Sequence, residues 1–62
     1  MELTHDIHNQ PFEILIVEDS PTQAERLRRL IQSRSYRVRV AGNGKLALDA
    51  IKASKPDLVL SD

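Results

Sequence analysis

Three acidic residues follow two apolar segments of the chain. The apolar segment 14–17 runs directly into Glu18 and Asp19, and the segment 58–61, apolar in its first three residues, runs into Asp62. Two carboxylates ~4 Å apart repel by about 1 kcal/mol in water and about 4 kcal/mol at an effective dielectric of about 20. If folding brings these acids together, they require a cation. All-oxygen ligation selects Mg²⁺, Ca²⁺ or Mn²⁺, and a site with few carboxylates is typical of Mg²⁺.

Three predicted strands position these acids. The apolar segment predicts a strand over Glu13–Glu18 that is buried on both faces. Residues Tyr36–Ala41 alternate between polar and apolar side chains, which predicts an edge strand with one face in water. Residues Asp57–Asp62 predict a third strand that is apolar like the first.

Two predicted helices separate the strands. Ser20 is a capping residue, Pro21 suits the first helical position, and the helix is expected to end near Ser33–Ser35. Asn43 is expected to cap a second helix, which ends before Pro56 because proline disfavours helix at the residue before it.

The resulting order of strand, helix, strand, helix, strand predicts an α/β fold. Short, right-handed connections imply a parallel sheet with helices on both faces. The two apolar strands are expected to be neighbours, with the alternating strand outside the first. This is the strand order 2-1-3 with which a flavodoxin-like sheet begins, and its ligand site lies where the first and third strands end.

Composition narrows the possible functions. Residues 1–11 are polar and aperiodic and are predicted to form a flexible leader, in which His5 and His8 are solvated and bind no metal. Lys and Arg together number nine, as do Asp and Glu, which argues against nucleic-acid binding and a polybasic membrane anchor. No apolar stretch approaches the ~20 residues of a membrane span, and no signal peptide is evident. We therefore expect a cytoplasmic protein.

Segments 14–20, 40–44 and 55–62 together resemble the first half of a response-regulator receiver domain of two-component signalling. The resemblance extends from about Phe12 to the end of the chain. It implies that Asp62 accepts a phosphoryl group from a histidine kinase or a histidine phosphotransfer protein. It also implies that Glu18, Asp19 and Asp62 hold Mg²⁺, and that the chain is a phosphoacceptor and not an enzyme.

The sequence departs from the family where it ends. Receiver domains have five strands, with a hydroxyl residue after the fourth and a lysine after the fifth, whereas this sequence ends with its third strand. We therefore interpret residues 12–62 as the N-terminal part of a receiver domain. The third strand has one predicted neighbour, and unpaired apolar edges recruit other chains. The isolated 62-residue chain is accordingly not expected to be a stable monomer, and self-association through this edge is one expected result.

Two alternatives come from other classes of protein. The segment Gly42-Asn43-Gly44-Lys45-Leu46-Ala47 fits the dinucleotide-binding pattern G-x-G-x-x-A, with an acid about 20 residues later. Arg37 and Arg39 in the preceding strand and the acidic pair at the same sheet edge argue against it. The other alternative is a receiver-like interaction module that is never phosphorylated. The acids at positions 18, 19 and 62 argue against that interpretation.

Overall fold

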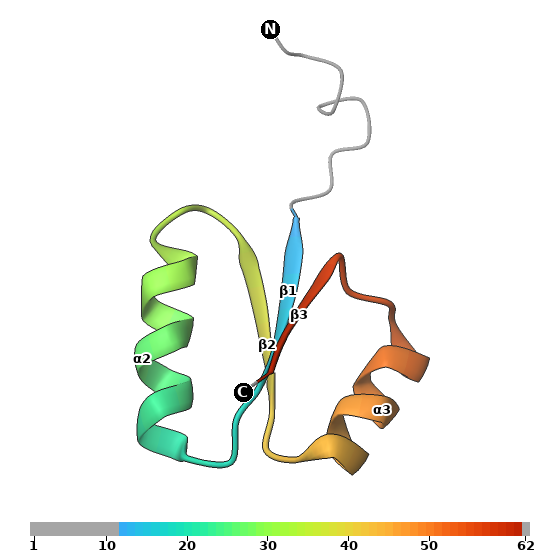
Figure 1. Cartoon of the computed structure of the whole chain (residues 1–62). Coiled ribbons are helices and arrows are strands. Elements are labelled where there is room, and N and C mark those ends of the chain that lie inside the picture. The colour runs from blue at the N-terminus through green and yellow to red at the C-terminus, as the bar shows by residue number, and fades with distance from the viewer. Residues whose placement is uncertain (1–11, 62) are drawn as a thin grey trace, which may run out of the picture.

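The structure is a computed structural model that describes residues 12–61 as three strands and two helices (Figure 1). The predicted leader 1–11, including His5 and His8, lies outside the described residues, and so does Asp62. The elements are β1 (Glu13–Val17), α2 (Pro21–Gln32), β2 (Arg37–Ala41), α3 (Gly44–Ala53) and β3 (Leu58–Ser61).

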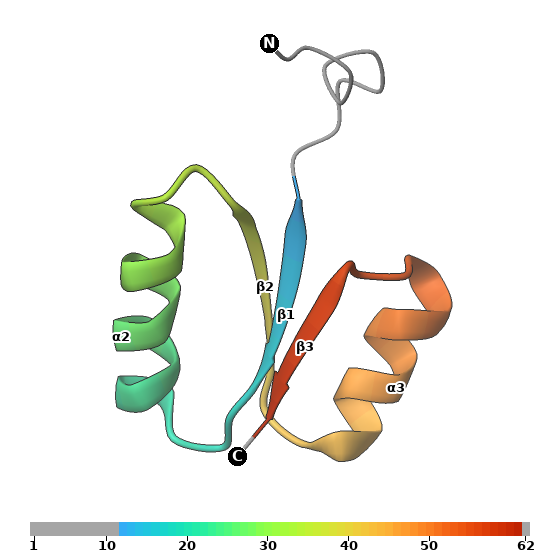
Figure 2. The ribbon, with the colours of Figure 1, turned by 45° about the horizontal axis from the view of Figure 1, so that its top comes forward.

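The strands form one parallel sheet in the order β2-β1-β3, which confirms the predicted order (Figure 2). β1 lies in the centre and is the most buried strand, with Leu15 and Ile16 both at 0% exposure. The register pairs Val17 with Ala41 on one side and with Ser61 on the other. All three strands therefore end at the same level, and the residues that follow them gather at one edge of the sheet.

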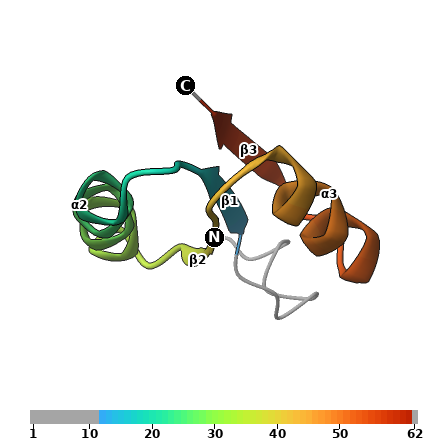
Figure 3. The same ribbon diagram turned by 90° about the horizontal axis from the view of Figure 1, so that it is seen from below.

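The helices cover opposite faces of this sheet (Figure 3). Both begin with the predicted caps: Ser20 Oγ accepts the Gln23 N–H at 3.3 Å, and Asn43 Oδ1 accepts the Leu46 N–H at 2.8 Å. These bonds satisfy N–H groups that the helix itself leaves without a partner. Because both helices start at the carboxyl ends of the strands, their first turns surround the same edge.

The hydrophobic core is divided between the two faces. Leu15, Ala41 and Ala47 form a buried cluster beneath α3. Side chains alternate along a strand, so Ile14 and Ile16 point to the α2 face, where Ala24 of the helix is also buried. Burial of alternate β1 residues on both faces explains why this strand lacks polar alternation.

The prediction of a face in water was wrong for Arg39. Its side chain is 28% exposed and lies 3.0 Å from the carboxylate of Glu13, which is 16% exposed. The Arg39 guanidinium also donates to the backbone carbonyl oxygens of Ala50 and Ser54 at the carboxyl end of α3. The alternation of β2 therefore separates an apolar face beneath α2 from a polar contact beneath α3.

β3 pairs with β1 along one edge, and within residues 12–61 no strand borders its other edge. Neither helix packs against it in this part of the chain. Leu58, Val59 and Leu60 are consequently 44%, 42% and 38% exposed. The predicted self-association through this strand stays a prediction.

Candidate functional site

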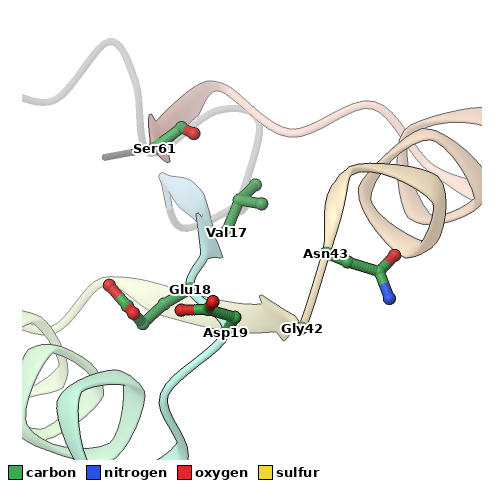
Figure 4. Close-up of a pocket in the computed structure, with 6 residues that line it drawn as sticks. All are labelled: Val17, Glu18, Asp19, Gly42, Asn43 and Ser61. Atoms are coloured by element: carbon green, nitrogen blue, oxygen red, sulfur yellow. The ribbon is translucent and has the colours of Figure 1, made fainter.

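A depression of about 380 Å³ lies at the carboxyl edge of the sheet (Figure 4). Every strand end contributes to this carboxyl-edge depression, which is lined by Val17, Glu18, Asp19, Gly42, Asn43 and Ser61. Its position matches the general rule that ligands of parallel α/β sheets bind beyond the carboxyl ends of the strands.

Glu18 is fixed by its backbone and by its side chain. Its N–H donates to the Ala41 carbonyl at 3.0 Å, which extends the pairing of β1 with β2 by one bond beyond the strand. Its Oε2 accepts the N–H of Ser20 at 3.1 Å, and Ser20 in turn caps α2. The turn from β1 into the helix therefore holds this carboxylate at the edge of the depression.

Asp19 is exposed and lies beside Glu18 in the depression. Among residues 12–61, no lysine or arginine lines the depression, so no described side chain there offsets the charge of the two carboxylates. Within residues 12–61, no third Asp, Glu, His or Cys joins them to form a metal-binding group. The available donors are oxygen atoms of carboxylate, hydroxyl and backbone groups, which suit a hard divalent cation.

The loop from β2 to α3 forms the opposite wall. Gly42 adds no side chain, and the amide oxygen of Asn43 is used to cap α3 (Figure 4). This wall therefore limits the depression without adding charge. The same loop carries the dinucleotide-binding pattern, but it shares the depression with two carboxylates, which would repel a pyrophosphate.

A second depression of about 330 Å³ lies on the α2 side of β3. It is lined by Val17, Glu18, Gln23, Leu27, Leu60 and Ser61. Glu18 and Ser61 line both depressions and so stand between them. A group bound at the carboxyl edge is therefore accessible from two sides.

The sequence matches the response regulator receiver domain family over residues 14–62. The chain belongs to this family. The match begins at the second residue of β1 and includes Asp62. It therefore covers every described helix and strand except the first residue of β1.

Curated relatives share this receiver domain. The chain is 41% identical over 49 residues to the DNA-binding response regulator MtrA of Mycolicibacterium smegmatis, a match that covers 79% of the chain and 22% of the relative. It is 40% identical over 52 residues to the response regulator MprA of Mycolicibacterium vanbaalenii, with 84% and 22% covered. It is 50% identical over 52 residues to the positive alginate biosynthesis regulatory protein of Pseudomonas aeruginosa, with 79% and 21% covered. No solved structure matches significantly.

The chain thus spans about a fifth of the length of the curated relatives it matches. Within residues 12–61, no helix of the receiver domain has the length and apolar character needed to cross a membrane.

Two of the three predicted site residues, Glu18 and Asp19, lie together in the carboxyl-edge depression, and Asp62 lies outside the described residues. Ser61 was not among the predicted site residues. Its place at this edge comes from the register of β3, which pairs Ser61 with Val17, and the residue types alone do not determine that register.

Proposed function

We propose that this receiver domain accepts a phosphoryl group on Asp62 from a histidine kinase or a histidine phosphotransfer protein. The carboxyl-edge depression is the observation that supports this proposal. It places Glu18 and Asp19 opposite Ser61, the residue that precedes Asp62 in the sequence. In this role the chain is the substrate of its phosphodonor and not an enzyme, and the proposed location is the cytoplasm.

Glu18 and Asp19 would hold Mg²⁺ in this proposal. The donor set fits, because it consists of oxygen atoms and carries two negative charges that no lysine or arginine among the described lining residues offsets. Glu18 has one carboxylate oxygen bonded to the Ser20 N–H, and the other forms no hydrogen bond within residues 12–61. When bound, Mg²⁺ supplies positive charge that offsets the charge on the phosphoryl oxygens.

The proposed reaction is a displacement at phosphorus. A carboxylate oxygen of Asp62 attacks the phosphorus, and the bond from phosphorus to the histidine nitrogen of the donor breaks as the new bond forms. The histidine nitrogen leaves with the electron pair of that bond.

The test is to incubate the protein with Mg²⁺ and acetyl phosphate and to measure acid-labile phosphate. We expect Asp62→Asn to abolish the label, because the amide cannot form an acyl phosphate. Asp49→Asn removes the same charge from an exposed position on α3 and serves as the matched control, which should retain the label. Unchanged labelling of Asp62→Asn would show that the acceptor has been assigned wrongly.

A further inference from the structure

Ser20 connects the acidic pair to the first turn of α2. It follows Asp19 directly and is the N-cap residue of the helix. Its N–H donates to Glu18 Oε2 at 3.1 Å, its Oγ accepts the Gln23 N–H at 3.3 Å, and its carbonyl accepts the Ala24 N–H at 2.9 Å. Each polar group of Ser20 therefore forms a hydrogen bond, two of them with the helix and one with a carboxylate of the depression.

The backbone conformation of Ser20 is favoured by the residue that follows it. Ser20 is extended, with φ −92° and ψ 115°. The ring of Pro21 disfavours the helical conformation at the preceding residue and favours this extended one. An N-cap residue requires the same extended conformation. Pro21 therefore holds Ser20 in the conformation that forms its bonds before any ligand is present.

The fold restrains the two acids of the pair to different degrees (Figure 4). Glu18 is half-buried, with its N–H bonded to the Ala41 carbonyl and its Oε2 bonded to Ser20. The Asp19 side chain is exposed and forms no hydrogen bond within residues 12–61. Ordering a flexible side chain opposes binding, because the side chain loses rotamer freedom. The bond from Ser20 reduces this entropy loss for Glu18.

We infer that Ser20 is a positioning residue of the cation site and couples Mg²⁺ binding at Glu18 to the start of α2. The inference rests on the proposed function, since it assumes that Glu18 is a ligand. The hydroxyl group of Ser20 fixes the residue against the helix, and its N–H holds the carboxylate. Such coupling is reciprocal, so the factor by which the cap raises Mg²⁺ affinity is also the factor by which bound Mg²⁺ stabilises the cap.

The experiment titrates Mg²⁺ into the protein by isothermal calorimetry. We expect Ser20→Ala to weaken Mg²⁺ binding about two- to tenfold, since the loss of one neutral hydrogen bond has an effect of that size. Ser20→Thr should restore the affinity, because threonine also caps helices. Ser33→Ala is the matched control. The Ser33 hydroxyl donates to the Leu30 carbonyl at 2.6 Å at the other end of α2, so this variant should bind Mg²⁺ like the unmodified protein.

Amide exchange in the same samples is the second readout. Saturating Mg²⁺ should slow exchange of the Ser20 and Gln23 N–H groups in the unmodified protein and in Ser33→Ala. In Ser20→Ala the slowing should be lost at Gln23, because the hydroxyl group that accepts this N–H is gone. This readout reports on the start of α2 without depending on phosphoryl transfer.

The outcomes separate this inference from the proposed function. Equal Mg²⁺ affinities of Ser20→Ala and the unmodified protein would overturn the inference and leave the proposed function standing. An equal loss of affinity in Ser33→Ala would also overturn it, because any weakening of α2 would then have the same effect. Absence of Mg²⁺ binding to the unmodified protein would contradict both the inference and the proposed cation site.

Discussion

Acidic residues lie at both ends of the sheet, but the groups that they bond to differ. At the amino end, both carboxylate oxygens of Glu13 face Arg39, with Oε2 3.0 Å from Nε and Oε1 3.2 Å from Nη2. Asp57 accepts the Glu13 N–H at 2.7 Å. At the carboxyl end, Glu18 has one bond to a backbone N–H, and Asp19 lies beside it with no cationic side chain from residues 12–61 lining the depression.

At the amino end, Arg39 pairs with the Glu13 carboxylate and also bonds the carboxyl end of α3. Its guanidinium offsets the Glu13 charge and donates to the carbonyl oxygens of Ala50 and Ser54 at 3.0 and 2.5 Å. The Ala50 carbonyl also accepts the Ser54 N–H at 3.0 Å, whereas the carbonyl of the C-cap residue Ser54 has no partner within the helix, so this arginine caps α3 from the neighbouring strand. The difference indicates that acids with partners stabilise this fold, whereas acids without them remain available to bind a ligand.

The largest expected effect comes from removing Arg39. Arg39→Met leaves the largely buried Glu13 charge without its counterion and the Ser54 carbonyl without its donor, while the Ala50 carbonyl keeps the Ser54 N–H. Breaking a fully buried ion pair costs roughly 3–5 kcal/mol, and the partial exposure of both side chains reduces the expected cost to about 2–3 kcal/mol. The measurement is the free energy of unfolding from urea denaturation, with amide exchange of the last turn of α3 as the local readout.

Arg26→Met is the control for this variant, since Arg26 is exposed on α2 and makes no ion pair within residues 12–61. It should change the free energy of unfolding by less than about 0.5 kcal/mol. Equal destabilisation by the two substitutions would mean that the amino-end contacts contribute no special stability.

The next largest effect is expected when the same substitution, Glu to Gln, is made at each end of the sheet. Glu13→Gln removes the counterion of Arg39 and should lower the free energy of unfolding by about 1–2 kcal/mol. Glu18→Gln should change it by less than about 0.5 kcal/mol, because the amide oxygen still accepts the Ser20 N–H. Thermal unfolding of the two variants side by side tests the comparison, and similar losses at both ends would refute it.

The sequence predicted the fold because the strands carry two different patterns, one continuously apolar and one alternating. The apolar residues at 14–17 require cover on both faces, so β1 was assigned to the centre, and the alternation over 36–41 assigned β2 to the edge. The partner of Arg39 was not predictable from that alternation. Its bonds depend on where the end of α3 lies above the sheet, and the connections on both sides of the helix set this position.

The candidate site was predictable in part, for a similar reason. Glu18 and Asp19 follow β1 directly, so identifying the strand was enough to place both at the carboxyl edge. Ser61 has no signal of its own in the sequence, because a serine near the end of a strand is common. Its membership depends on the register of β3 against β1, which the residue types alone do not determine.

A smaller effect should follow from removing a charge at the carboxyl end. Without Mg²⁺, Asp19→Ala should leave the free energy of unfolding unchanged or raise it by up to about 1 kcal/mol, because one of two neighbouring negative charges is lost. Mg²⁺ at ten times its dissociation constant should stabilise the unmodified protein by about 1.4 kcal/mol. The variant should gain less at the same concentration, since it has lost a carboxylate.

Isothermal titration of Mg²⁺ into both proteins measures the affinity directly, and Asp49→Ala provides a control with the same loss of charge at a distance. Identical affinities for the unmodified protein and Asp19→Ala would exclude Asp19 as a metal ligand.

The smallest effect concerns Glu25, an acid that has partners but is less buried than Glu13. The Arg28 and Arg29 side chains donate to Glu25 at 2.6 and 2.9 Å on α2 and lower the pKa of its carboxyl group from 4.5 to about 2. A lowered folded-state pKa adds stability above the unfolded value, and that stability is lost as the pH falls from about 4.5 toward about 2. We therefore expect Glu25→Gln to be slightly less stable at pH 7 and equal to the unmodified protein near pH 2. Because water and salt screen these exposed pairs, the difference at pH 7 should also shrink in 1 M NaCl. A loss as large as that of Glu13→Gln would mean that pairing alone, without burial, explains the stability of the amino end.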